Sequence, residues 1–358
     1  MTTQHYYGCG MEEFMYLEKI QSPEDVKKLD VEQLKVLAGE MRQALIQKLS
    51  VHGGHVGPNL GMVEATIAMH YVFDSPKDKM VFDVSHQSYC HKMLTGRADA
   101  FLDEAKYDDV SGYSEPSESA HDFFCIGHTS TSVSLACGLA KARDLADENY
   151  NVIAVIGDGS LSGGEALEGL DFAKELNGNL IVVVNDNEMS IAENHGGLYE
   201  NLKLLRDTKG QAECNIFKAM GLNYVFVEDG NDLTQLIDAF KRVKDSKAPV
   251  AVHIHTLKGK GYTLAEENKE SWHWHMPFDI ETGKTKGNYD GGEDYGTLTA
   301  DYLLQKMKED ASVVAITSAT PTVFGFTKDK REQAGRQFVD VGIAEEHAVA
   351  LASGLATG

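Results

Sequence analysis

The chain has 358 residues, of which 42% are hydrophobic and 25% charged, so it is long enough to bury two hydrophobic cores. The formal net charge of −22 is spread along the chain, which argues against binding to nucleic acid or to an anionic membrane surface. Five cysteines without a C-x-x-C pair, no basic and apolar leader and no long apolar run predict a cytoplasmic protein without disulfides, a cysteine zinc site or a membrane span.

The first periodic segment follows Asp30. Apolar residues recur at three- and four-residue steps from Leu34 to Leu49, which is the pattern of an amphipathic helix. Asp30 is suited to cap this helix, because Gln33 stands three residues later and completes a capping box. We expect the helix to end near residues 51–54, where two glycines follow.

Three short apolar runs, at residues 152–156, 180–184 and 250–255, alternate with helical patterns. Continuous apolar strands separated by helices predict an α/β fold with a parallel sheet covered on both faces. Ligands of such sheets bind at the carboxyl ends of the strands. The chemistry is therefore expected at Gly157-Asp158-Gly159 and at Asn185-Asp186-Asn187.

A polar, glycine-rich stretch at residues 281–296 predicts a domain boundary. A helical pattern at 298–307, apolar runs at 313–316 and 339–343, and a helix beginning at Glu345 follow it. We expect a first domain of residues 1–290 and a second of residues 291–358. Two candidate strands would leave sheet edges uncovered, so the second domain is expected to be incomplete within this chain.

The strongest chemical signal is Asp158 at one strand end, with Asn187 29 positions later at the next. Mg²⁺ takes oxygen ligands, using one or two from the protein and leaving other positions for phosphate and water. Asp158 offers a carboxylate and Asn187 an amide oxygen, while Gly159 lets a diphosphate approach the backbone. The alternative is two unrelated polar turns, because Gly-Asp-Gly alone is a common sequence.

The segments around this pair resemble the 1-deoxy-D-xylulose-5-phosphate synthase family from about Gln21 to Gly358, and transketolases less closely. The resemblance implies a thiamine-diphosphate-binding fold, in which a diphosphate-binding domain precedes a pyrimidine-binding domain. The residues that follow the equivalent of Gly358 in that family bind the aldehyde's phosphate, so we expect residues 1–358 alone to be catalytically incomplete. The matching segments are residues 54–61, 82–87, 127–132, 185–190, 258–262 and 343–349.

The same resemblance implies a cofactor site. Asp158, Asn187 and the main-chain carbonyl of Met189 would bind Mg²⁺. Thiamine diphosphate would be lined by His86, Gly127, His128, Thr129, Gly159, Ser160, Asn187, Tyr262 and Glu345.

Three residues are candidates for catalysis. Glu345 would hydrogen-bond the aminopyrimidine ring and activate the cofactor, although a carboxylate in the first turn of a helix is also favoured without any function. His55 and His273 are candidates to orient the substrate or to transfer protons near neutral pH.

The function implied by the resemblance is a transferase that condenses pyruvate with glyceraldehyde 3-phosphate to 1-deoxy-D-xylulose 5-phosphate and CO₂. This product would supply isoprenoid, thiamine and pyridoxal biosynthesis, and the enzyme is expected to be a homodimer. The alternatives are a transketolase-like enzyme with a ketose-phosphate donor, and a non-catalytic cofactor-binding subunit or degenerate paralogue. Release of CO₂ from pyruvate separates the synthase from the transketolase-like enzyme, and a contiguous downstream coding segment with the missing strands would count against the non-catalytic alternative.

Three positions depart from the family pattern. The stretch Tyr113–His121 lacks the usual basic residue and gains Glu115, which predicts weaker attraction for an anionic substrate or a different loop order. Ser85 stands where the family usually has glycine, and Glu165 where an apolar residue is common. These changes leave the predicted metal motif intact.

Overall fold

The computed structural model describes residues 15–176, 178–287 and 294–358. Their largest element is a five-stranded sheet with the order β1-β2-β3-β5-β4, in which all neighbouring strands pair in parallel. The predicted strands at 152–156, 180–184 and 250–255 are confirmed, whereas β1 and β4 are not among the predictions. The strands are β1 (Lys79–Phe82), β2 (Val152–Gly157), β3 (Ile181–Asp186), β4 (Asn223–Val227) and β5 (Val250–His255).

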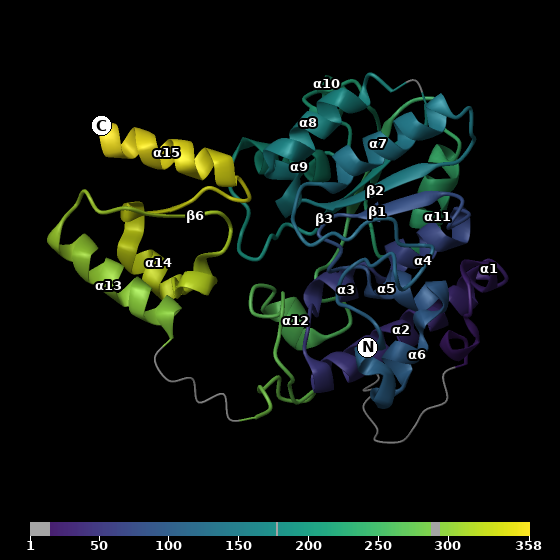
Figure 1. The fold of residues 1–358 in the computed structure, drawn as a ribbon, viewed down its shortest axis with the longest axis horizontal. Helices are drawn as coiled ribbons and strands as arrows, with labels where there is room; N and C mark the ends of the chain where they lie inside the picture. Colours follow the sequence, from purple (N-terminus) through teal and green to yellow (C-terminus); the bar gives the residue numbers. More distant parts are fainter. Residues whose placement is uncertain (1–14, 177, 288–293) are drawn as a thin grey trace.

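Helices cover both faces of this sheet (Figure 1). Successive side chains of a strand point to opposite faces, so Ile153 on β2 packs into one core and Ala154 into the other. The first core also contains residues of α2 (Val31–His52), α4 (Val63–Val72) and α11 (Leu233–Val243). The second contains residues of α7 (Ser132–Leu145), α8 (Gly164–Ala173), α9 (Gly197–Asp207) and α10 (Ile216–Ala219).

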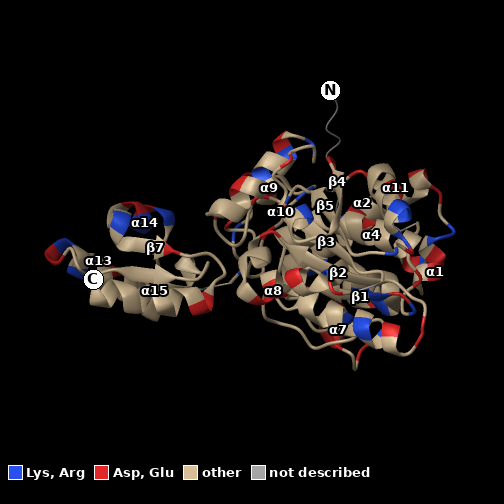
Figure 2. Ribbon diagram, turned by 90° about the horizontal axis from the view of Figure 1, so that it is seen from above, with Lys and Arg blue, Asp and Glu red and all other residues tan. Residues whose placement is uncertain are grey.

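Short helices join these elements, and charged side chains lie mainly on the outer helices and loops (Figure 2). Within the parts of the chain that the structure describes, no helix combines the length and apolar character needed to cross a membrane. The short α-helices are α1 (Pro23–Val26), α3 (Gly57–Gly61), α5 (Tyr89–Lys92), α6 (Asp99–Leu102) and α12 (Thr263–Glu267). The other helical turns are Leu17–Lys19, Met93–Arg97, Glu104–Asp109, Gly159–Ser162, Pro321–Phe324 and Gly335–Gln337.

Helix α2 begins and ends as predicted. The Asp30 carboxylate accepts a hydrogen bond from the Gln33 backbone N–H at 2.9 Å, and the Gln33 side chain accepts one from the Asp30 N–H at 2.8 Å. This capping box satisfies two N–H groups that the helix itself cannot pair. The helix ends at Gly53, whose φ of 76° lies in the left-handed region that favours glycine.

A smaller unit lies to one side of the main sheet (Figure 1). It consists of α13 (Tyr295–Glu309), β6 (Ala315–Thr317), α14 (Lys328–Ala334), β7 (Phe338–Asp340) and α15 (Glu345–Thr357), with β6 and β7 paired in parallel. Its core includes Leu304, Met307 and Phe326, whereas α15 buries none of its side chains. The predicted helix start at Glu345 is confirmed, and the predicted boundary between residues 290 and 291 lies outside the described residues.

The packing of α2 predicts a contrast between two adjacent residues. Leu37 is completely buried and Val36 is 47% exposed. Leu37→Ala should lower the free energy of unfolding by about 3 kcal/mol because it leaves a cavity. Val36→Ala should change it by less than about 0.5 kcal/mol. Urea unfolding of both variants measures the difference, and equal losses would show that α2 does not pack in this orientation.

Candidate functional site

The carboxyl ends of the parallel strands border a cavity of about 300 Å³. The turns after β1, β2 and β3 line it on one side, and residues of the smaller unit line it on the other. Most of the predicted site residues meet here. Those that line the cavity are His55, His86, Gly127, His128, Thr129, Asp158, Gly159, Ser160, Met189, His273 and Glu345.

Asp158 follows β2 directly and is only 1% exposed. Its backbone N–H donates to the Asn185 carbonyl at 3.0 Å, which extends the pairing of β2 with β3 by one residue. Its carboxylate accepts a hydrogen bond from the neutral side chain of Asn194 at 2.9 Å. Burial, followed by the negative charge of Asp186, raises the pKa of Asp158 well above its usual value. A cation bound at this carboxylate would therefore offset a large cost of ionisation.

The neighbouring Asp186 is paired, unlike Asp158. It accepts a hydrogen bond from His253 Nε2 at 2.8 Å and forms an ion pair with Arg206. Burial alone would raise the pKa of Asp186, but these hydrogen bonds and charges outweigh burial and lower it. Asp186 is therefore paired with His253 and Arg206 and is not among the residues that line the cavity, whereas Asp158 lines it.

Asn187 and Met189 lie in the turn after β3. The Asn187 amide oxygen accepts a hydrogen bond from the Met189 N–H at 3.2 Å, and Glu188 between them has a positive φ of 67°. Met189 lines the cavity, whereas Asn187 is buried beside it and is not among the lining residues. Among the described residues, no group of three or more His, Cys, Asp or Glu side chains has an arrangement that could bind a metal ion.

Gly159 permits a close approach between two loops of the site. A Cβ atom added there would lie 2.7 Å from the Cβ of Ser190, closer than side chains pack. The turn after β2 therefore requires glycine at this position. With no side chain in the way, the backbone after Asp158 remains accessible from the cavity.

Three histidines form a cluster in the cavity wall. The ring centroid of His55 lies 4.7 Å from that of His86 and 5.7 Å from that of His273. Burial lowers the pKa of His55 to about 4, and it lowers the pKa values of His86 and His273 well below their usual range. All three rings are therefore neutral at pH 7. The buried Nδ1 atom of His86 has no hydrogen-bond partner within the described structure.

Lys258 was not predicted as a site residue, although it stands in one of the matching segments. Its side chain is buried, and Nζ donates to the Ser190 carbonyl at 2.7 Å and to His273 Nδ1 at 3.1 Å. Burial lowers the pKa of Lys258 to about 8, so the amine is still mostly protonated at pH 7. The available signal was its place three residues after β5, at the same sheet edge as Asp158.

Glu345 begins α15 and brings a carboxylate from the smaller unit to the cavity. Its Oε1 atom lies 3.9 Å from Nε2 of His128, and the Glu345 side chain is 51% exposed. Ser318 and Thr320, which follow β6, line the same side and were not predicted. The two units also contact each other through a hydrogen bond from the Ser162 hydroxyl to the Ile343 carbonyl at 3.3 Å.

Like Asn187, Tyr262 is a predicted cofactor residue that does not line the cavity. Its side chain is buried against Trp272, with ring centroids 5.0 Å apart, and its hydroxyl donates to the Ile280 carbonyl at 2.9 Å. In this structure the Tyr262 side chain packs against Trp272 and Phe278.

Comparisons with known proteins agree with this architecture. A family model described as 1-deoxy-D-xylulose-5-phosphate synthase matches residues 17–215 and 203–256. The protein 1-deoxy-D-xylulose-5-phosphate synthase 1 from Geobacter sulfurreducens is 43% identical over 95% of this chain and 59% of its own length. The synthase of Listeria monocytogenes is 42% identical over 96% of this chain and 58% of its own length. The chain thus spans about three-fifths of the length of these curated relatives.

Solved structures share the fold at low sequence identity. Transketolase from Campylobacter jejuni superimposes with a TM-score of 0.57 at 18% identity, covering 86% of this chain and 46% of the transketolase. Transketolase from Leishmania mexicana superimposes with a TM-score of 0.54 at 16% identity, covering 89% of this chain and 61% of the transketolase. These likenesses establish a transketolase-like α/β fold. Together with the family match over most of the chain, they lead to one assignment: the chain belongs to the 1-deoxy-D-xylulose-5-phosphate synthase family.

Proposed function

We propose that this chain forms part of a thiamine-diphosphate-dependent transferase that condenses pyruvate with glyceraldehyde 3-phosphate. The products would be 1-deoxy-D-xylulose 5-phosphate, a precursor for isoprenoid, thiamine and pyridoxal biosynthesis, and CO₂. The observation that carries the proposal is the cavity at the sheet edge. This cavity brings together the buried Asp158 carboxylate, the accessible backbone at Gly159 and three neutral histidines. The chain that contains it belongs to the 1-deoxy-D-xylulose-5-phosphate synthase family.

The residues present fit Mg²⁺ and thiamine diphosphate. Asp158 is a buried carboxylate without a cationic hydrogen-bond partner among the described residues. His86 Nδ1 and Gln87 Oε1 are buried polar atoms that the described residues leave without hydrogen bonds, and both residues line the cavity. Buried polar atoms of this kind are expected where a polar ligand completes the site.

We assign the Mg²⁺ ligands to Asp158, Asn187 and the Met189 carbonyl, which come from the turns after two adjacent strands. The diphosphate would lie against Gly159 and Ser160, with Asn187 beside it. When bound, thiamine diphosphate supplies the electron sink that allows a 2-keto acid to lose CO₂. The remaining cofactor contacts would come from His86, Gly127, His128 and Thr129.

The histidine cluster is suited to binding the substrate's oxygen atoms. His55, His86 and His273 are neutral at pH 7, so each ring offers one N–H donor and one acceptor nitrogen. Lys258 adds a positive charge next to His273, which favours an anionic group in an otherwise strongly acidic protein. We assign substrate orientation and proton transfer to His55 and His273.

Glu345 is assigned the activation of the cofactor. Its carboxyl group would share a proton with a ring nitrogen of the aminopyrimidine, and Ser318 and Thr320 of the smaller unit line the same side of the cavity. In this proposal residues 1–290 form the diphosphate-binding domain, and residues from 291 onward belong to the pyrimidine-binding domain.

A cytoplasmic homodimer completes the proposal. The four cysteines that the structure describes are all free, which suits a reducing compartment.

The proposal of a dimer is supported by exposed apolar side chains. On α15, Val349 is 70% exposed and Leu355 is 49% exposed. Such exposed apolar side chains favour contact with another surface.

The function is tested with the full-length protein, thiamine diphosphate and Mg²⁺. Carboxyl-labelled pyruvate should release CO₂ in a reaction stimulated by glyceraldehyde 3-phosphate, and mass spectrometry should identify 1-deoxy-D-xylulose 5-phosphate. Turnover of a ketose phosphate without CO₂ release from pyruvate would instead favour the transketolase-like alternative. Cofactor binding without any turnover would favour a non-catalytic subunit.

The metal assignment predicts a loss of binding in Asp158→Ala. Calorimetry of the wild type should show thiamine-diphosphate affinity that depends on Mg²⁺, because Asp158 would hold the cofactor through the metal ion. Asp158→Ala should weaken binding at least about a hundredfold, since a charge-assisted contact at a buried site is lost. Asp171→Ala, an exposed carboxylate on α8, is the control and should bind as the wild type does. Equal affinity of the two variants would contradict the assignment.

A substitution at Glu345 should affect activation of the cofactor but not its binding. Glu345→Gln should retain substantial cofactor affinity, because the diphosphate anchor is untouched. Exchange of the hydrogen on the thiazolium C2 atom should slow by about a hundredfold or more, since an amide cannot accept and return the proton. Glu346→Gln, the adjacent carboxylate, serves as the control. Exchange at the wild-type rate in Glu345→Gln would remove Glu345 from the activation step.

A further inference from the structure

Ser85 is a buried residue with an unfavourable backbone. It lies between β1 and α5, next to His86, and its exposed fraction is 0%. Its φ of 68° and the φ of 56° at Val84 both lie in the left-handed region that favours glycine. Residues other than glycine remain in this region where the surrounding structure fixes them, and such positions cluster at functional sites.

The Ser85 hydroxyl joins three segments of the chain. It donates a hydrogen bond to the Ile126 carbonyl at 2.9 Å and accepts one from the Ser114 N–H at 2.8 Å. Ser85 itself belongs to the turn that carries His86, and Ile126 immediately precedes Gly127 in the cavity wall. The bond to Ser114 connects both of these segments to the loop of residues 111–122.

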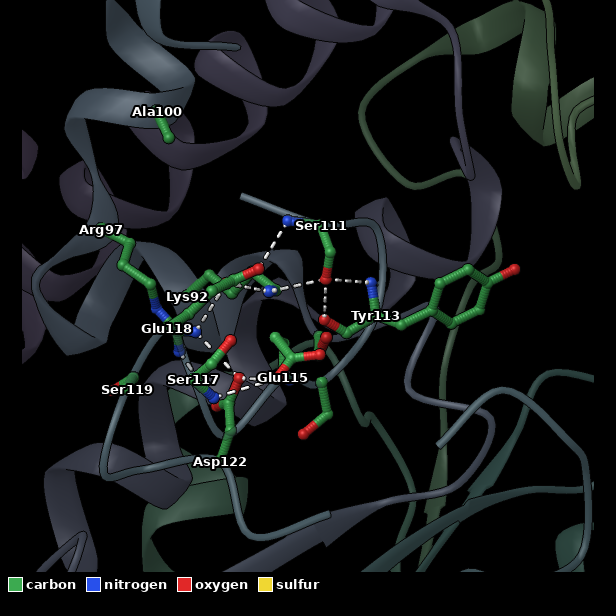
Figure 3. Close-up of polar contacts among 12 residues, drawn as sticks. Lys92, Arg97, Ala100, Ser111, Tyr113, Glu115, Ser117, Glu118, Ser119 and Asp122 are labelled. Carbon is green, nitrogen blue, oxygen red and sulfur yellow. Dashed lines mark hydrogen bonds and ion pairs between the residues drawn. The ribbon is translucent and has the colours of Figure 1, made fainter. Parts of the chain in front are cut away.

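The outer half of this loop has separate anchors (Figure 3). The Glu118 carboxylate forms ion pairs with Lys92 and with Arg97, and it accepts the Ser111 N–H at 2.6 Å. The Lys92 side chain is completely buried. These charges hold the loop at Glu118. Ser85 holds it at Ser114, next to the turn that carries His86.

Tyr113 is the residue of the loop that reaches the histidine cluster. Its ring extends away from the ion-pair cluster (Figure 3) and meets the His55 ring edge-on, with centroids 6.0 Å apart. Tyr113 directly precedes Ser114, so the hydrogen bond from Ser114 to Ser85 restrains the tyrosine backbone. The Ser111 hydroxyl also holds the Tyr113 backbone by donating to its carbonyl at 2.7 Å. Because Tyr113 is 39% exposed, loss of the bond to Ser85 would give its ring room to move relative to His55.

We propose that Ser85 is a positioning residue whose hydroxyl holds the 111–122 loop against the turn that carries His86 and keeps Tyr113 in contact with His55. Tyr113 then packs against the His55 ring, which lines the cavity, and fixes its orientation. The catalytic consequence rests on the proposed function, whereas the hydrogen bond itself can be measured in the absence of turnover.

Amide hydrogen exchange tests the hydrogen bond. The Ser114 N–H should exchange about tenfold faster in Ser85→Ala and in Ser85→Gly than in the wild type, because its acceptor is lost. The Ser130 N–H, which donates to Asp83 at 2.9 Å, should remain protected and is the internal reference. Ser88→Ala removes another buried hydroxyl of the same turn and should leave Ser114 protected. Wild-type exchange at Ser114 in both Ser85 variants would overturn the proposal.

A double-mutant cycle tests the link to Tyr113 in the full-length enzyme. Ser85→Gly and Tyr113→Ala should each lower kcat/KM for pyruvate about tenfold, and the double variant should lose little more, because both changes remove the same contact. Ser85→Gly should melt at or above the temperature of Ser85→Ala, since glycine adopts the positive φ without strain. Lower activity of Ser85→Gly could then not be explained by lower stability.

Failure of the positioning role and failure of the proposed function would give different results. Additive effects in the cycle, or full activity of Ser85→Gly despite faster exchange at Ser114, would overturn the positioning role. A wild-type enzyme that releases no CO₂ from pyruvate would contradict the proposed function instead. In that case the exchange rate of the Ser114 amide would still decide whether Ser85 holds the loop.

Discussion

The parallel pairing of the main sheet is the constraint on which the site depends. Because all five strands point the same way, their carboxyl ends meet at one edge. The pairing of Gly157 with Asn185 places Asp158 beside the turn that contains Asn187 and Met189. β5 ends at the same edge, and it delivers Lys258. Residues separated by about a hundred positions in the chain thereby become neighbours, as Asp158 and Lys258 illustrate.

Burial gives this edge an electrostatic character that the whole protein lacks. The chain carries a net charge of −22, yet the cavity contains neutral histidines and the protonated amine of Lys258. Asp186 is neutralised by His253 and Arg206, so its charge contributes little to the cavity. Asp158 accepts its hydrogen bond from a neutral amide instead. A cation and an anionic cofactor can therefore be bound locally, despite an acidic exterior that would repel free phosphate.

Backbone strain is concentrated around the same edge. Positive φ angles occur at five residues other than glycine that line the cavity or adjoin its lining residues. Hydrogen bonds hold several of these residues in place. For example, the Asp83 carboxylate accepts hydrogen bonds from the N–H groups of Ser130 and Ser132. Strain that the surrounding structure supports in this way is typical of sites whose geometry is fixed before the ligand binds. The five residues are Val84, Ser85, Ser130, Glu188 and Ala319.

The sequence by itself determined the elements whose signal is local. The capping box at Asp30, the apolar runs of β2, β3 and β5, and the helix start at Glu345 all depend on neighbouring residues, and the structure confirms them. β1 and β4 escaped prediction for a physical reason. β1 has only four residues, and β4 lies at the sheet edge, where Val227 alone is fully buried, so neither shows a long apolar run.

Only the tertiary structure decided how distant residues meet. The sequence predicted Asp158 as a metal ligand and gave the nearby Asp186 no role, and it contained no sign that His253 and Arg206 approach Asp186 and pair with it. The tertiary structure also packed Tyr262 against Trp272, outside the set of residues that line the cavity. The physical reason is that burial and the partners of a charge are set by chain segments far away in the sequence, which no local pattern encodes.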